Sequence, residues 1–292
     1  MTFSRKSKSN RLLGYPDDAR LLIINADDFG ICHAANEATL TALKEGVVTS
    51  TSLMVPCPWG LHAMRLLMEN SAIDFGVHLT AICDMDDYKW RPIISKEKVP
   101  TLIDESGYFY SLERLPDFLA RARVDELELE FRAQIEAVLA ARLKPTHLDW
   151  HCMHDGGRQD IFEMTFGLAK EYGLAMRVSG PLFIERLQSQ GFPTDDHDLM
   201  DSYDLDIEAK SGRYAHMLRE LPVGLSEWAV HPALGNAELQ AIEPGSWQVR
   251  QTDFDFVMSQ EAQDILKAEG IILLDYQALQ SIWIEAIGRI PK

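Results

Sequence analysis

Short apolar runs alternate along the first part of the chain with segments of helical periodicity. Leu21 to Ile24 are four consecutive aliphatic residues, which is typical of a strand buried on both faces of a parallel sheet. Residues 34–44 carry apolar positions at helical spacing and end at Gly46. The same pattern continues with a strand, a helix and a strand over 47–55, 59–68 and 75–79. This β–α–β–α–β order predicts an α/β fold built on a parallel sheet.

The alternation continues to the end of the chain. Four more strands are predicted around residues 147–151, 175–178, 227–232 and 271–274. Helices are predicted over 112–143, 160–172, 259–269 and 276–287, with shorter helical pieces near 182–190 and 211–220. No linker, repeat or glycine-rich dinucleotide motif divides this series. We therefore expect one domain over residues 19–292, a distorted TIM-like (β/α) barrel with a core of parallel strands, after a flexible arm over residues 1–18.

Residues 81–110 interrupt this alternation. The segment is rich in acids, prolines and aromatic residues, among them Trp90, Tyr108 and Tyr110. A long irregular segment in a compact domain is usually functional or disordered. Its aromatic side chains favour a loop that binds sugars or bases, and a packed surface excursion explains the composition equally well.

The charge of the chain argues against several partners. The formal net charge is −17, whereas nucleic acids and anionic membranes select clustered Lys and Arg. No apolar run approaches the roughly 20 residues that span a bilayer. The four cysteines are scattered without CxxC spacing, and no apolar stretch follows the basic N-terminus as it would in a signal peptide. We expect a cytoplasmic protein that binds neither nucleic acid nor membrane.

Titratable residues stand where the predicted strands end. They are Asp27 and Asp28, His78, the cluster from His147 to His154, Arg177 and His231. In a parallel α/β barrel the carboxyl ends of all strands meet on one face, where active sites are built. Several histidines at equivalent strand ends, beside two carboxylates, are difficult to explain by packing alone.

Imidazole and carboxylate ligands together suit Zn²⁺, Fe, Mn²⁺ or Co²⁺. Such a metal lowers the pKa of a bound water, a second carboxylate can take the proton, and a histidine across the site can protonate the leaving group. The pattern therefore predicts a metal-dependent hydrolase. A phosphoesterase or amidohydrolase on the same barrel, or a catalytically silent sugar-binding barrel, are the alternatives.

Four motifs, in order along the chain, carry a resemblance to a known family. They are Asn25-Ala26-Asp27-Asp28-Phe29-Gly30, Gly76-Val77-His78-Leu79, Thr146-His147-Leu148-Asp149-Trp150-His151 and Val230-His231-Pro232. With the segment from Val99 to Phe109, this set resembles the YdjC (ChbG/HpnK-like) carbohydrate deacetylases over about residues 21–280.

The resemblance implies a distorted (β/α) barrel that removes N-acetyl groups from amino sugars or short N-acetylated oligosaccharides. It implies one divalent metal ion, Mg²⁺ or Zn²⁺, and allows a homodimer. Carried over by position, the metal ligands are Asp28, His78 and His151. Asp27 is the general base and His231 the general acid, and Arg177 matches an arginine that orients the base.

The third motif departs from the family pattern. Trp150 stands where the family commonly has a small residue, which suggests that Trp150 or Met153 shapes a different sugar pocket. His147 and His154 remain alternatives to His151 as the third ligand, since His154 follows His151 by three residues. Asp149 is then expected to orient a ligand histidine.

Overall fold

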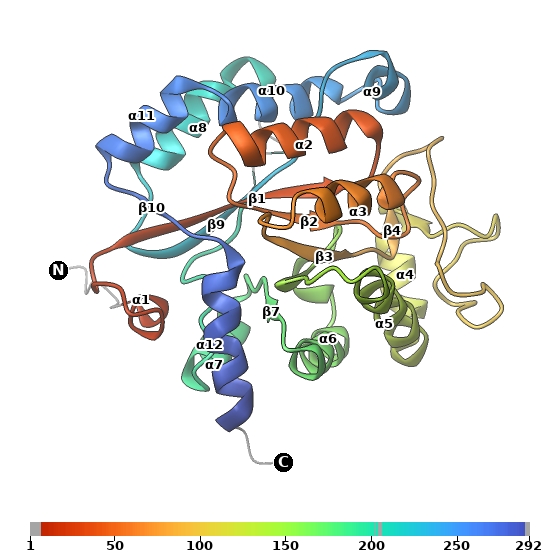
Figure 1. The fold of residues 1–292 in the computed structure, drawn as a ribbon. Helices are drawn as coiled ribbons and strands as arrows, with labels where there is room; N and C mark the ends of the chain where they lie inside the picture. Colours follow the sequence, from red (N-terminus) through yellow and green to blue (C-terminus); the bar gives the residue numbers. More distant parts are fainter. Residues whose placement is uncertain (1–6, 202, 204–205, 290–292) are drawn as a thin grey trace.

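The computed structural model describes residues 7–201, 203 and 206–289, and a parallel sheet lies at its centre. Among these residues the strand order is β7–β6–β3–β2–β1–β9–β8. The start of β1 also pairs with β10, while its end pairs with β2. The sheet curls into a barrel (Figure 1). This barrel is only partly closed, because β7 and β8 are the two ends of the sheet and, over the described residues, do not pair with each other. The predicted α/β fold with a distorted barrel of parallel strands is confirmed.

Seven of the eight strands of this sheet are those that the apolar pattern predicts. The strands are β1 (Arg20–Phe29), β2 (Ser50–Leu53), β3 (Phe75–Leu79), β6 (His147–Trp150), β7 (Ala175–Met176), β8 (Met200–Asp201), β9 (Gly224–Val230) and β10 (Ile272–Leu273). The additional strand is β8, which lies in an acidic stretch without an apolar run. A separate pair, β4 (Ile82–Cys83) and β5 (Tyr110–Ser111), forms a small parallel sheet.

Helices cover both sides of the strands (Figure 1). The α-helices are α1 (Lys8–Leu12), α2 (His33–Glu45), α3 (Gly60–Glu69), α4 (Leu115–Arg121), α5 (Val124–Ala140), α6 (Gln159–Tyr172), α7 (Pro181–Ser189), α8 (Lys210–Arg219), α9 (Ala237–Ile242), α10 (Trp247–Val257), α11 (Gln260–Ala268) and α12 (Tyr276–Arg289). Within the described part of the chain, none of them combines the length and apolar character that a membrane span requires.

The first strand is buried on both faces, as its four aliphatic residues predict. Leu21 and Ile23 join the larger apolar core, while Leu22 and Ile24 join a second core beneath α8, α10 and α11. Successive residues of a strand point to opposite faces, so a strand between two cores needs an unbroken apolar run.

Helices α9 and α10 were not predicted from the sequence. Helix α10 buries Arg250 and Asp253 on the same side as Phe256 and Val257. Polar residues on the buried face weaken the apolar periodicity that identifies an amphipathic helix. The pattern of hydrophobicity therefore does not identify this segment as a helix.

The expected flexible arm over residues 1–18 contains a helix. Residues 1–6 lie outside the described residues, but Lys8–Leu12 form helix α1, which Ser7 caps by accepting a hydrogen bond from the Asn10 amide. Ser9 and Asn10 are fully buried, and Ser9 Oγ donates a hydrogen bond to the Thr194 carbonyl (2.5 Å). Polar contacts hold this helix, so no apolar run in the sequence indicates it.

The segment over residues 81–110 packs against the barrel through its aromatic residues. Trp90, Phe109 and Tyr110 are buried, and Trp90 Nε1 donates a hydrogen bond to the Ile82 carbonyl (2.9 Å). These side chains belong to the core, so a packed excursion describes them better than a set of exposed sugar platforms does.

Gly76 in β3 lies against a side chain that has no room to move. A Cβ atom at this position would lie 2.5 Å from Cδ2 and Nε2 of His147, and the His147 ring is stacked on Tyr276 at 3.6 Å between centroids. Gly76→Ala is therefore expected to lower the free energy of unfolding by about 1–3 kcal/mol, the range for overpacking a core. Urea denaturation followed by circular dichroism measures this change.

Gly167→Ala is the matched control. A Cβ at Gly167 meets no atom within 4 Å, and the residue lies inside α6, where alanine is favoured over glycine by up to about 1 kcal/mol. The control should therefore be neutral or stabilising. Equal stability of Gly76→Ala and the wild type would contradict the observed position of His147.

Candidate functional site

A cavity of about 240 Å³ opens at the carboxyl ends of the strands. It brings together almost all of the strand-end residues predicted from the sequence, which come from five different strands and the loops after them. Those that line it are Asp27, Asp28, His78, Trp150, His151, Arg177 and His231. Asp149 lies directly behind His78, with its Oδ1 2.9 Å from His78 Nδ1. The barrel thus makes one site from segments more than 200 residues apart.

The two adjacent carboxylates face the same cavity because the backbone of β1 is irregular there. Asp28 has a φ angle of 66°, in the left-handed region, and the pairing of β1 with β2 shifts register between Ala26 and Phe29. In a regular strand, neighbouring side chains point to opposite faces. The irregularity turns Asp28 to the same side as Asp27, and aspartate tolerates this conformation better than most residues.

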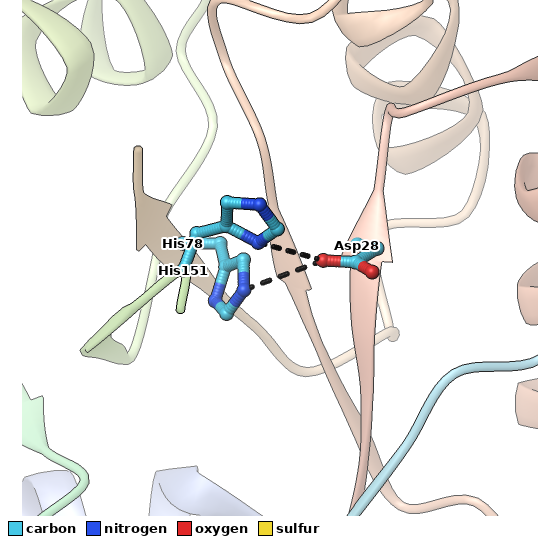
Figure 2. Close-up of side chains that lie close together, drawn as sticks. All are labelled: Asp28, His78 and His151. Carbon is cyan, nitrogen blue, oxygen red and sulfur yellow. Dashed lines mark ion pairs between the residues drawn. The ribbon is translucent and has the colours of Figure 1, made fainter. Parts of the chain in front are cut away.

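Asp28, His78 and His151 form a buried cluster (Figure 2). Asp28 Oδ1 lies 3.4 Å from His78 Nε2 and 3.2 Å from His151 Nδ1. All three side chains are at most 3% exposed. Burial alone would raise the pKa of Asp28, but Arg250 and the two histidines outweigh it and hold this pKa well below its ordinary value.

This cluster could hold a metal ion. Zinc–ligand bonds of about 2.0–2.2 Å place two ligands of one ion roughly 3–3.5 Å apart, which the distances from Asp28 Oδ1 match. Asp28 Oδ1 is buried without a hydrogen-bond partner among the described residues. A buried carboxylate oxygen that lacks a hydrogen-bond partner and lies near two ring nitrogens is typical of a cation site. Asp28 Oδ2 is held separately by Arg250 Nη1 at 2.8 Å.

Arg177 sits between three buried carboxylates. Its guanidinium donates to both oxygens of Asp27 at 2.7 Å, and lies 3.1 Å from Asp149 Oδ2 and 2.7 Å from Glu227 Oε1. Burial would raise the pKa of Asp27, but the charge of Arg177 outweighs it and lowers this pKa below the ordinary value. Asp27 therefore remains an ionised acceptor at neutral pH.

His231 lines the same cavity and lies beside a second buried ion pair, Lys210–Asp253. Its backbone N–H donates to Asp253 Oδ2 (2.8 Å), and its Nδ1 lies 3.9 Å from the same oxygen. Asp253 is in turn anchored by Lys210 Nζ at 2.9 Å and by the Tyr214 hydroxyl. The His231 side chain keeps 13% exposure and faces the cavity.

The two alternative histidines lie outside the cluster. His147 is stacked on Tyr276 and its Nδ1 lies 3.0 Å from Thr146 Oγ1. Burial lowers the pKa of His147 to about 3, so the ring is neutral. His154 is exposed at the cavity rim, and neither histidine belongs to a group of potential metal ligands in the described part of the chain.

Trp150 lines the cavity with its ring packed near Phe162, and its Nε1 donates a hydrogen bond to Thr165 Oγ1 (3.3 Å). Met153 is buried and lines the same cavity. Both side chains line the cavity, and their role in shaping a sugar pocket stays a prediction.

Sequence reasoning missed several residues that complete the site. They are Asp84, Glu227, Arg250, Asp253 and Lys210. Glu227 had a detectable signal, because a carboxylate inside an apolar strand needs a buried partner. The others lie on helices and on the irregular segment, where nothing in the local pattern indicates the barrel mouth.

The fold and the site define a class: an α/β barrel with a buried acid–histidine cluster and two further titratable residues at the mouth. The sequence model of the family described as YdjC-like protein matches residues 21–268. The chain belongs to this family.

Named relatives agree with this assignment. A carbohydrate deacetylase of Thermoanaerobacter pseudethanolicus is 30% identical over 261 residues, which are 89% of this chain and 100% of that protein. One from Enterococcus faecalis is 31% identical over 270 residues, 88% of this chain and 97% of that protein. A crystal structure from Enterococcus faecalis V583, named as a candidate cellobiose-phosphate cleavage protein, superposes with a TM-score of 0.75 at 29% identity, covering 89% of this chain and 99% of that one.

Proposed function

We propose that this protein hydrolyses the N-acetyl group of amino sugars or short N-acetylated oligosaccharides. One observation carries the proposal: Asp28, His78 and His151 converge in a cavity that Asp27 and His231 also line. The deacetylase names of the relatives at about 30% identity support the same reaction.

Asp28, His78 and His151 would hold one divalent ion, Mg²⁺ or Zn²⁺. When bound, such an ion polarises a carbonyl and lowers the pKa of a water molecule. Arg250 occupies Asp28 Oδ2, so Oδ1 alone faces the two imidazoles. This division of the two oxygens prevents the carboxylate from rotating away from the ligand set.

Asp27 would act as the general base. Its carboxylate is ionised because Arg177 binds both oxygens, and it lies beside the cluster, with Oδ2 4.0 Å from His78 Nε2. Arg177 orients the group, and Asn25 Nδ2 adds a hydrogen bond to Asp27 Oδ1 (2.7 Å). The base is thus fixed in position before a substrate arrives.

His231 would act as the general acid that protonates the leaving amine. Its Nδ1 is buried, has no hydrogen-bond partner among the described residues and lies 3.9 Å from Asp253 Oδ2. Amide hydrolysis needs a proton on the departing nitrogen, and a histidine titrates in the range where it can supply one.

The cavity favours an amide over a phosphoester. Arg177 is the one arginine or lysine among the residues that line it, and its guanidinium is already occupied by Asp27, Asp149 and Glu227. No cation is then left free in the described lining to bind phosphate oxygens. The full set of titratable residues also argues against a silent sugar-binding barrel.

Acetate release tests the proposal. The protein, loaded with Zn²⁺ or Mg²⁺, should release acetate from N-acetylglucosamine or N-acetyl chito-oligosaccharides and lose this activity in a chelator. Phosphate release from phosphorylated sugars, measured in parallel, should stay at background. Release of phosphate without acetate, or acetate release that a chelator leaves unchanged, would refute it.

A further inference from the structure

Each ligand histidine of the cluster has a carboxylate near its second ring nitrogen. His78 faces Asp28 with Nε2, and its Nδ1 lies 2.9 Å from Asp149 Oδ1. His151 faces Asp28 with Nδ1, and its Nε2 lies 3.3 Å from Asp84 Oδ1. The two imidazoles thus use opposite nitrogens toward the cluster, but each has an acid behind it.

Asp84 reaches this position from outside the barrel strands. It follows β4 directly, in the irregular segment over 81–110, and its side chain is 16% exposed. Its Oδ1 is buried and has no hydrogen-bond partner among the described residues. His151 Nε2, 3.3 Å away, is the nearby donor that can satisfy this oxygen, while Oδ2 lies 3.9 Å from Arg250 Nη2.

The irregular segment holds Asp84 firmly. The backbone N–H of Trp90 donates a hydrogen bond to Cys83 Sγ (3.4 Å). The Trp90 indole N–H donates a hydrogen bond to the Ile82 carbonyl (2.9 Å). The Trp90 ring also packs edge-on against His151, with 5.8 Å between centroids. The buried aromatic residues of this segment therefore fix both the carboxylate and the imidazole that it faces.

We propose that Asp84 is a positioning residue that orients His151 for metal binding, as Asp149 orients His78. The proposal rests on the proposed function, in which His151 is a metal ligand. A carboxylate behind a ligand histidine fixes the ring and its tautomer and makes the ligand nitrogen more basic. The segment over 81–110 then serves the metal site itself.

Cys152 is the competing partner for the same nitrogen. Its Sγ lies 3.3 Å from His151 Nε2, and Asp84, His151 and Cys152 form a group that could hold a second ion. A thiol is only a weak hydrogen-bond partner, whereas a carboxylate is a strong acceptor, so Asp84 is expected to dominate.

Metal affinity separates these possibilities. Zn²⁺ affinity is measured by competition with a chromophoric chelator, and Co²⁺ absorption reports the ligand geometry. Asp84→Asn should weaken affinity by about 10–100-fold and change the Co²⁺ spectrum. Asp86→Asn removes an exposed acid two residues away and should change neither, and Cys152→Ala should change affinity less than threefold, on the order of a weak neutral contact.

The outcomes are distinguishable. Wild-type affinity in Asp84→Asn, a larger loss in Cys152→Ala, or two ions per wild-type chain would overturn the role of Asp84. Failure of the wild type to bind any metal or release acetate would instead overturn the proposed function. Thermal unfolding of the metal-free variants checks that a lower affinity does not reflect a misfolded chain, and Asp149→Asn gives the affinity loss expected for the equivalent carboxylate.

Discussion

His78→Ala is expected to leave the protein folded, without bound metal and without deacetylase activity. The substitution removes one of three converging ligands and leaves Asp28 Oδ1 with a single imidazole. Polarisation by a metal contributes several kcal/mol to a transition state, and about 4 kcal/mol corresponds to a loss of roughly a thousandfold in rate. Elemental analysis of the purified variant and acetate release at saturating Zn²⁺ measure both effects.

His154→Ala is the control for this experiment. His154 lies at the rim of the same cavity, exposed and outside the ligand cluster. Its removal should leave metal content unchanged. If His154→Ala lost the metal while His78→Ala kept it, the assignment of His151 and its two partners as the ligand set would fail.

Arg177→Met should destabilise the protein more than any surface substitution. The change leaves Asp27, Asp149 and Glu227 buried without the cation that they share. Removing one partner of a buried ion pair typically costs about 3–5 kcal/mol, because an uncompensated charge remains inside. Urea unfolding at pH 7 gives the free energy, and acetate release should fall with it because Asp27 loses its orientation.

The loss of stability in Arg177→Met should be smaller in acid than at neutral pH. Arg177 helps to hold the pKa of Asp27 and of Asp149 below the ordinary 3.8, against burial, which would raise it. A lowered folded-state pKa gives stability that is present above 3.8 and is lost as pH falls through the lower folded values. The difference in the free energy of unfolding between the wild type and Arg177→Met should therefore be largest near neutral pH and should decrease in acid.

Arg132→Met provides the comparison. Arg132 pairs with Glu128 and Glu171 on the surface, where its side chain is 28% exposed. Ion pairs of this kind contribute about 0–1 kcal/mol. A loss at Arg132 as large as that at Arg177 would show that burial of the carboxylates is not the cause.

The sequence by itself determined the parallel α/β barrel and most of its strand ends. An unbroken aliphatic run such as Leu21 to Ile24 is stable only between two apolar layers, and the structure places it there. Parallel strands bring their carboxyl ends to one face, so the sequence alone groups Asp27, His78 and His231. The family resemblance then chose His151 from three nearby histidines, and the structure places His147 and His154 outside the cluster.

The tertiary structure alone decided how these residues are held. The φ angle of Asp28 turns both acids to one side, which no rule for a regular strand predicts. Arg250 and Asp84 reach the site from a helix and an irregular segment, at sequence distances of 222 and 67 residues from Asp28 and His151. Local periodicity reports only which face of an element is apolar. A buried charge is stable only beside its partner, and that partner is chosen by the packing of the whole chain.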